Sequence, residues 1–170
     1  MISKTYIDKI ANTTATSPTN DIPQPSEEQK KAGTYKKGHL NIYGLNIAIE
    51  NPKDSIRSGV DRNGKHWSIK LKNHYGYILG TVGKDKDHVD VFIGPSPNSE
   101  KVYIVNQKNS DNKFDEHKIL LGWDSFPDAV KGYLDNYEKR WDMISSVHQS
   151  DINGIKDWLK NGNTKVPYKG

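Results

Sequence analysis

The spacing of apolar side chains along the chain predicts strands first and helices later. Between residues 38 and 121, apolar positions alternate with polar ones or gather in short runs, which is typical of half-buried and buried strands. Turn sequences such as Asp61-Arg62-Asn63-Gly64 separate these runs. No helical spacing interrupts them, so the pattern predicts a small antiparallel β-barrel of roughly five to six strands. The expected strands lie near residues 40–49, 67–71, 77–79, 89–93, 102–105 and 119–121.

Helical signals stand at the two ends of the chain. Ser26-Glu27-Glu28-Gln29 is a capping box that predicts a short helix ending at Gly33. Asp124 or Ser125 is expected to cap a second helix, with Pro127 in its first turn. Ser150 is expected to cap the last helix. The predicted fold class is therefore α+β, with two C-terminal helices packed against the barrel.

Composition divides the chain into three parts. Residues 1–33 are rich in Thr, Asn, Ser and Pro in their first two thirds, which predicts a flexible N-terminal arm with a short helix. Residues 34–162 carry the strand and helix patterns and form the expected barrel domain. Residues 163–170 are expected to be a frayed tail. A chain of 170 residues is long enough for one such domain.

Charge and residue content exclude several classes of protein. The chain has 25 Lys and Arg against 21 Asp and Glu, so its net charge is only +4. This mild excess favours a small, phosphate-rich anion as partner and predicts no specific nucleic-acid binding. The absence of cysteine excludes disulfides and thiolate zinc sites. No signal peptide or long apolar run is present, so a cytoplasmic protein without membrane contact is expected.

Three aspartates on one short loop are the main candidate for chemistry. Asp85, Asp87 and Asp90 lie within six residues, directly before and within the apolar run Val89–Ile93. Ionised carboxylates this dense are hard oxygen ligands suited to Mg²⁺ or Mn²⁺. A solvated acidic turn is the alternative interpretation. An EF-hand is excluded because the loop lacks the glycine and the bidentate glutamate of that motif.

Other polar residues stand at the ends of predicted strands. Each of them alone is most often a solvated surface group. Strand ends meet at the rim of a barrel, however, so together these residues predict a pocket for divalent cations and a phosphate-rich anion. They are Glu50, Arg57, Tyr75, Tyr77, Asp111, Asp115, Glu116 and Lys118.

Five segments in this order resemble family I soluble inorganic pyrophosphatases over roughly residues 38–140. The most specific is the Asp loop preceded by Tyr75-Gly76-Tyr77-Ile78. The other segments are residues 47–52, 56–61 and 111–118. Residues 32–39 are in addition similar to a divergent branch encoded by bacteriophages and mobile elements, which would place the protein in the host cytoplasm.

The resemblance implies a fold, a reaction and roles for particular residues. The fold is a five-stranded OB-like barrel with helices against it, and the reaction is hydrolysis of pyrophosphate to two phosphates with several Mg²⁺ ions. Asp87 matches the carboxylate that activates the attacking water. The implied metal-binding residues are Glu50, Asp85, Asp87, Asp90, Asp111 and Glu116. The implied phosphate-binding residues are Arg57, Lys70, Tyr75, Lys118 and Tyr137. Related bacterial enzymes oligomerise, so a homo-oligomer is possible.

Four positions depart from the pattern of that family. Gly59 replaces a metal-site glutamate, Glu116 an aspartate, His88 the proline of the Asp loop, and Glu138 a lysine. We expect these changes to weaken one peripheral metal and one phosphate contact. Three other functions therefore stay open: a phosphate- or nucleotide-binding module without catalysis, a metal-dependent nucleotide pyrophosphohydrolase or phosphodiesterase, and a phage factor that acts on a partner through its surface.

Overall fold

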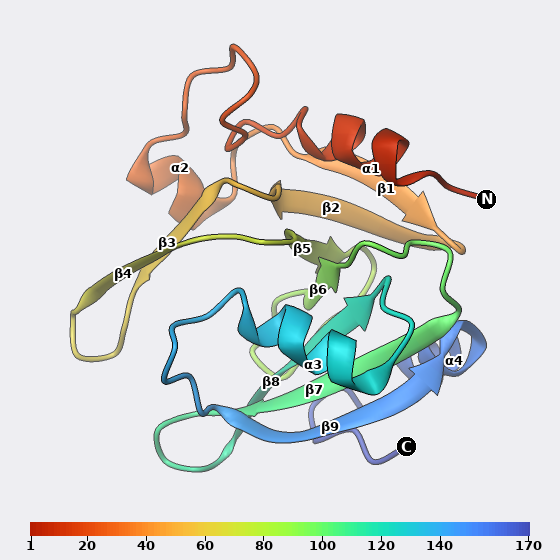
Figure 1. Cartoon of the computed structure of the whole chain (residues 1–170). Coiled ribbons are helices and arrows are strands. Elements are labelled where there is room, and N and C mark those ends of the chain that lie inside the picture. The colour runs from red at the N-terminus through yellow and green to blue at the C-terminus, as the bar shows by residue number, and fades with distance from the viewer.

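One mixed sheet of seven strands forms the centre of the protein (Figure 1). The computed structural model describes all of residues 1–170. In chain order the strands of this sheet are β1 (Gly38–Ile42), β2 (Leu45–Asn51), β5 (His74–Ile78), β6 (Val89–Ile93), β7 (Lys101–Lys108), β8 (Phe114–Leu121) and β9 (Ile144–Asp151). Across the sheet the order is β1-β2-β5-β6-β8-β7-β9, and β6 and β8 are the one parallel pair.

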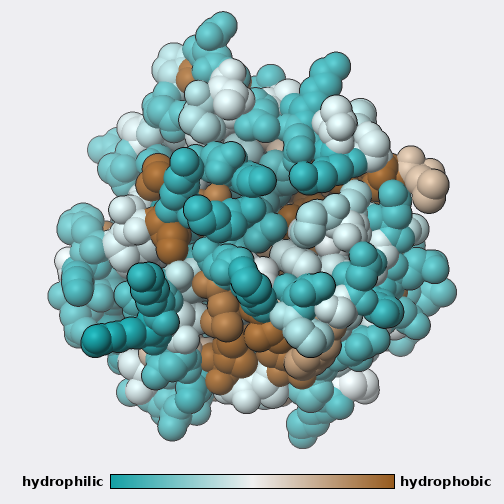
Figure 2. Space-filling view, in the orientation of Figure 1, coloured by the Kyte–Doolittle hydropathy of each residue, from teal (hydrophilic) through white to brown (hydrophobic).

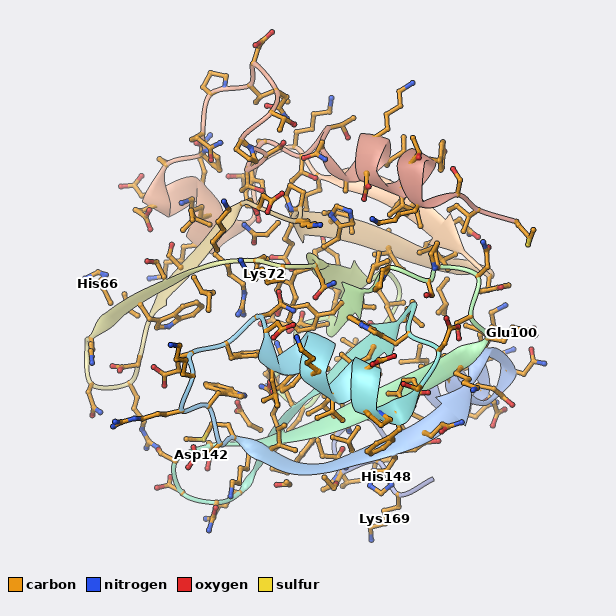
Figure 3. The ribbon with its side chains drawn as sticks, viewed as in Figure 1. His66, Lys72, Glu100, Asp142, His148 and Lys169 are labelled. Atoms are coloured by element: carbon orange, nitrogen blue, oxygen red, sulfur yellow. The ribbon has the colours of Figure 1, made fainter.

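A separate two-stranded ribbon extends away from this sheet. It consists of β3 (Ile56–Val60) and β4 (His66–Lys70), which pair antiparallel with Gly59 opposite Trp67. Figure 3 labels His66 on this ribbon, at the margin of the molecule. Most of the ribbon is exposed, so it contributes little to the core. The first residues of β3 line the cleft that is described below.

Four helices complete the fold: α1 (Lys4–Ala11), α2 (Glu27–Ala32), α3 (Phe126–Leu134) and α4 (Ile152–Asn161). The capping box predicted for α2 is confirmed, because the Ser26 hydroxyl accepts from the Gln29 amide and the Gln29 side chain accepts from the Ser26 amide. Asp151, not Ser150, caps α4 by accepting from Gly154 N at 2.7 Å. None of the helices has the length and apolar content needed to cross a membrane.

The prediction of a closed OB-like barrel with five to six strands is wrong in both closure and strand number. β1 and β9 stand at opposite ends of the strand order and do not pair with each other. Two strands were not predicted: β3 of the ribbon, and β9, whose sequence Ile-Ser-Ser-Val-His-Gln-Ser-Asp contains few apolar residues. An edge strand that buries little of either face needs no period-two pattern, so its sequence does not predict a strand. The coarser expectation of an α+β fold dominated by strands is confirmed.

The sheet buries side chains on both faces. One face packs against α1 and α4, through residues such as Ile7, Ile155 and the strand residue Val91. The other face packs against α3, which lies on the near side of the sheet in Figure 1, and holds Phe92 and Tyr133. Adjacent residues of β6 thus point to opposite cores, which explains why its sequence is apolar throughout.

The two ends of the chain lie against the sheet. In the first helix Ile7 and Ala11 are buried, and the Thr14 hydroxyl donates to Ile49 O at 3.1 Å and accepts from Gly38 N at 2.9 Å. Near the other end, Tyr168 is buried. The Asn106 side chain donates to Tyr168 O and accepts from Tyr168 N, both at 2.9 Å. Figure 3 marks the adjacent Lys169 below His148 of β9. The boundaries at residues 33 and 163 remain predictions, but neither end is detached from the body of the protein.

A buried histidine connects α1 to the centre of the sheet. His74, the first residue of β5, accepts a hydrogen bond from Lys53 N at its Nδ1 atom, 2.9 Å away. Its Nε2 atom lies 2.7 Å from a carboxylate oxygen of Asp8 on α1. An Nδ1 atom that accepts carries no proton, so Nε2–H donates to Asp8. Burial lowers the pKa of His74 below its usual value, although Asp8 opposes this effect. The ring is therefore neutral in the folded protein at neutral pH.

We predict that His74→Phe destabilises the protein by about 1–3 kcal/mol at pH 7, because Lys53 N–H is left without its acceptor. The difference in the free energy of unfolding between wild type and His74→Phe should narrow as pH falls from 7 to 5. The pKa of His74 is lower in the folded state than the unfolded value of about 6.5, so the unfolded wild-type chain binds the extra proton and only wild type loses stability.

Urea unfolding at several pH values measures both effects. His66→Phe is the matched control, since His66 is exposed on β4, and it should change the free energy of unfolding by less than about 0.5 kcal/mol. A difference between His74→Phe and wild type that widens toward acid pH would show that His74 is charged in the fold.

Candidate active site

A cleft of about 540 Å³ opens where the ends of β2, β5, β6 and β8 meet. The loop before β6 borders one side of it, and the segment from α2 to β1 borders another. The first residues of β3 also reach it, so the exposed ribbon begins at the rim of the cleft. Five carboxylates from four segments line this cleft: Glu50, Asp85, Asp87, Asp90 and Glu116.

The parallel pairing of β6 and β8 brings the central charges together. Asp90 of β6 lies directly opposite Lys118 of β8 in the register. Side chains alternate along each strand, so Glu116 and Lys118 share the face that also carries Phe92 and the α3 core. Val91 and Ile119, the next residues along, point to the opposite core. The alternation of side chains along the strands thus places the charged groups of Glu116 and Lys118 at the edge of the buried core that contains Phe92.

Lys118 is the centre of the charged network. Its side chain is only 1% exposed, and its Nζ atom lies 2.7 Å from Asp90 Oδ2 and 2.5 Å from Glu116 Oε1. The same nitrogen donates to the Tyr75 hydroxyl at 2.7 Å. Burial would lower the pKa of Lys118, but Asp90 and Glu116 outweigh it and hold this pKa well above its usual value. The ammonium group is therefore charged, and all three of its N–H donors have partners.

Tyr75 joins the two cations of the cleft. Its hydroxyl donates to Asp90 Oδ2 at 2.8 Å and accepts from an Arg57 nitrogen at 3.3 Å, in addition to Lys118. The Arg57 guanidinium also lies 4.3 Å from the centre of the Tyr75 ring. Burial raises the pKa of Tyr75 well above its usual value, so the hydroxyl keeps its proton and the bond to Asp90.

A second layer of hydrogen bonds orients Glu116, and the sequence offered no signal for it. Gln107 Nε2 donates to Glu116 Oε1 at 3.3 Å, and the Tyr133 hydroxyl donates to Gln107 Oε1. Trp141 Nε1 in turn donates to the Tyr133 hydroxyl at 2.9 Å. A glutamine in a strand and a tyrosine on an apolar helix face are ordinary core residues by pattern. Only the pairing of β7 with β8 and the docking of α3 show that they support the site.

Glu50 lies at the other side of the charged centre. Burial, followed by the neighbouring charge of Asp90, raises the pKa of Glu50 to about 7. A hydrogen bond from the N-terminal segment holds the Glu50 backbone in place, because the Thr16 hydroxyl donates to Glu50 O at 2.6 Å. A carboxylate that is costly to ionise beside a second carboxylate is a position where a cation would be stabilising.

The donor set fits a hard divalent cation, although the side chains do not form a finished cage. Five carboxylates, with no thiol and a single histidine beside them, favour Mg²⁺ or Mn²⁺ over zinc. No three His, Asp or Glu side chains converge closely enough to hold one ion. Lys118 contacts Asp90 and Glu116 in the place where a cation would neutralise them. Asp85 accepts from Asp87 N at 3.1 Å, and both side chains are exposed at the mouth of the cleft.

Four of the predicted site residues do not line the cleft, and one of them is Asp115, which is exposed on β8. Asp111 is exposed on the loop between β7 and β8, 3.3 Å from Arg62 of the ribbon turn. Lys70 is exposed at the end of β4. Tyr137 lies behind the cleft, stacked on Trp141 with ring centres 4.3 Å apart, and its buried hydroxyl has no partner. The structure brings the remaining predicted residues together: Glu50, Arg57, Tyr75, Tyr77, Asp85, Asp87, Asp90, Glu116 and Lys118.

Trp67 occupies the space beside Gly59. A Cβ atom at Gly59 would come within 2.6 Å of the Trp67 ring, so any larger residue would displace it. The Arg57 guanidinium lies 5.1 Å from the centre of that same ring. The expected loss of a carboxylate at Gly59 is thus accompanied by an aromatic contact that positions a cation of the site.

A family described as Inorganic Pyrophosphatase matches residues 27–160. The chain belongs to the inorganic pyrophosphatase family. This confirms the resemblance found in the sequence and makes the protein a pyrophosphatase-like hydrolase, a class for which pyrophosphate hydrolysis in general is expected.

Comparisons with curated proteins and with solved structures add little to the inorganic pyrophosphatase assignment. No curated protein gives a significant match. A crystal structure of an inorganic phosphatase from Anaplasma phagocytophilum aligns with 69% of this chain and 90% of its own length, at 18% identity and a TM-score of 0.43. Similarity at this level carries no argument about the site.

We predict that Lys118→Met destabilises the protein by about 3–5 kcal/mol, because it leaves Asp90 and Glu116 without their buried counter-charge. Urea unfolding in the absence of divalent cations measures the effect. Lys113→Met removes an equal charge from an exposed position of the same hairpin and should cost less than about 0.5 kcal/mol. Equal stability of the two variants would mean that the Lys118 ammonium does not hold the carboxylates together.

Proposed function

We propose that the protein hydrolyses inorganic pyrophosphate to two phosphates with the help of Mg²⁺, Mn²⁺ being a possible substitute. The observation that supports this most is the cleft in which five carboxylates face Arg57 and Lys118. Pyrophosphate is a compact polyanion, so a site for it must combine ligands for cations with cationic groups of the protein. The family match makes this reaction the first one to test.

The carboxylates have separate tasks in this proposal. Asp85, Asp87, Asp90, Glu50 and Glu116 would hold the divalent cations. When bound, such cations make a water molecule more acidic and neutralise the phosphate charge. Asp87 takes the proton of the attacking water, whose oxygen bonds to one phosphorus while the bridging P–O bond breaks. The second phosphate leaves with the electron pair of that bond.

The cationic and phenolic groups stabilise the leaving phosphate. Arg57 is held by the Tyr75 hydroxyl and by two aromatic rings, so its fork is oriented before substrate arrives. Lys118 is different, because its three donors are already used by Asp90, Glu116 and Tyr75. It can turn a donor to a phosphate oxygen only when another positive charge neutralises one of its carboxylate partners. We infer that cation binding and phosphate binding are coupled through Lys118.

One observation supports a second candidate function, a phosphate- or nucleotide-binding module without turnover. The position of Gly59 offers no carboxylate and has no room for one beside Trp67. A site with one cation ligand fewer could still bind a polyphosphate without reaching the reactive geometry. Nucleotide pyrophosphohydrolysis, cytoplasmic location, bacteriophage origin and self-association remain predictions from the sequence.

We predict that wild-type protein releases phosphate from pyrophosphate in the presence of Mg²⁺, and that Asp87→Asn lowers kcat at least 100-fold because the proton acceptor is lost. Nucleoside triphosphates, cyclic dinucleotides and ADP-ribose are tested in parallel. Asp61→Asn is the control, since its oxygen keeps the turn bonds to Asn63 N and Lys65 N outside the cleft. Asp111→Asn should have a far smaller effect than Asp87→Asn, because Asp111 lies outside the cleft.

Three results would contradict this assignment. An undiminished rate in Asp87→Asn rules out Asp87 as the proton acceptor. Turnover of nucleotides but not of pyrophosphate favours the nucleotide pyrophosphohydrolase. Tight binding of pyrophosphate without any turnover favours the binding module.

We predict that Mg²⁺ stabilises the folded protein, by about 2.7 kcal/mol when its concentration is 100 times the Kd. The combined substitution Asp85→Asn with Asp87→Asn should remove most of this effect, whereas Asp61→Asn should preserve it. Thermal unfolding with added MgCl₂ and with EDTA measures the shift without any enzymatic assay. The same shift in the double variant and in wild type would place the cation elsewhere.

A further inference from the structure

One side of the cleft comes from the segment before the first strand, and the reaction proposed above does not use it. We call this side the N-terminal wall and define it as Lys30 and Lys31 of α2 with Tyr35 and Lys37 of the segment that follows. Figure 1 shows α2 beside the start of β3. Figure 2 shows hydrophilic surface interrupted by small hydrophobic patches over this part of the molecule.

Hydrogen bonds to the sheet and within the segment hold the N-terminal wall in place. Lys36 O accepts from Ala15 N at 2.9 Å, and the neighbouring Thr14 and Thr16 hydroxyls bind the end of β2. Lys37 is half-buried, and its ammonium donates to Gly33 O at 2.6 Å and to Tyr35 O at 3.3 Å. It also lies 4.2 Å from the centre of the Tyr35 ring. An ammonium group has three donors, so one donor of Lys37 is left for the cleft.

The cations of the N-terminal wall form no ion pair with the carboxylates of the cleft, although the charge of Lys37 counteracts the rise in the pKa of Glu50. Arg57 and Lys118 interact with the group around Asp90. No carboxylate lies within ion-pair distance of Lys31 or Lys37, and Lys30 pairs only with Glu27, at 3.5 Å. Exposed pairs of that kind are weak. The cleft lining carries five cations and five carboxylates, and three of those cations stand together on the N-terminal wall.

The cleft is also large for pyrophosphate. Its volume of about 540 Å³ lies in the range of pockets that enclose drug-sized molecules. Pyrophosphate contains only two phosphoryl groups joined by one oxygen, and the carboxylates with Arg57 already provide for both. A positive wall beyond them, with an aromatic ring beside it, has room for a further anionic group.

We propose that the N-terminal wall binds a third phosphoryl group, so that the site accepts a triphosphate chain, either as inorganic tripolyphosphate or as the triphosphate end of a nucleotide. This rests on the proposed function, because the same carboxylates act on the terminal anhydride. Water bonds to the terminal phosphorus, the adjacent bridging P–O bond breaks, and its electron pair leaves with pyrophosphate or a nucleoside diphosphate. The water proton goes to Asp87, while the N-terminal wall holds the phosphoryl group farthest from the attacked phosphorus.

The test compares kcat/KM for tripolyphosphate and for pyrophosphate in wild type, Lys37→Met and the double variant Lys30→Met with Lys31→Met. The ratio of the two values should fall about tenfold or more in Lys37→Met, the size expected for one charge-assisted hydrogen bond. Lys36→Met is the matched control. It removes the same charge from the neighbouring residue, which is exposed and does not line the cleft. ATP assayed beside tripolyphosphate distinguishes the esterified chain from the inorganic one.

Each outcome decides the proposal. A ratio that stays unchanged in both lysine variants, whether neither substrate or both substrates lose kcat/KM, overturns the assignment of a third phosphoryl group without contradicting the proposed pyrophosphate hydrolysis. If wild type hydrolyses neither substrate, the proposed function fails, and calorimetric Kd values for the two polyphosphates replace the rates. A selective loss of tripolyphosphate affinity in Lys37→Met, absent in Lys36→Met, then still supports the N-terminal wall, and no selective loss overturns it.

Discussion

The buried ammonium of Lys118 is the interaction on which the site depends. Asp90 and Glu116 come from different strands and would repel each other at the edge of a dry core, where charges are weakly screened. One cation between them allows both to remain ionised and keeps Tyr75 aligned with Asp90. The same contact bears on the proposed function, because a divalent cation bound by Asp90 or Glu116 would compete with Lys118 for the same oxygens. Without added cations, Lys118 thus holds these two carboxylates in place.

The sheet provides the rigidity that this arrangement requires. β6 and β8 lie side by side in parallel, near the middle of the strand order, with cores on both faces. Gly76 of β5 could not be larger, since an added Cβ atom would meet Ala48 O of β2 at 1.9 Å. Close strand packing at this point leaves little freedom for Tyr75, the next residue. The hydrogen-bond chain from Trp141 through Tyr133 and Gln107 adds support from the α3 side.

The N-terminal residues contribute to the site from outside the sheet. α1 is held to β5 through His74 and Asp8, and the residues after α1 bind the end of β2 next to Glu50. The connection from these contacts to α2 and Tyr35 places lysines along one side of the cleft. A segment that looks like a mobile arm by composition is therefore part of the architecture around the carboxylates. Its polar residues are hydrogen-bonded to backbone groups of the sheet, which composition alone does not show.

The sequence by itself determined the local elements and the chemistry of the main loop. Period-two spacing predicted most strands, the capping box predicted α2, and the Asp loop with its Tyr-Gly-Tyr-Ile segment indicated the pyrophosphatase family. These signals are short-range, because each depends on a few neighbouring residues. The tertiary structure alone decided that the sheet is open, that the polar strand β9 forms its edge, and that Asp111, Lys70 and Tyr137 lie outside the cleft. It also decided which carboxylates Lys118 pairs with and that α2 borders the site, since both depend on strand order and docking between segments far apart in the chain.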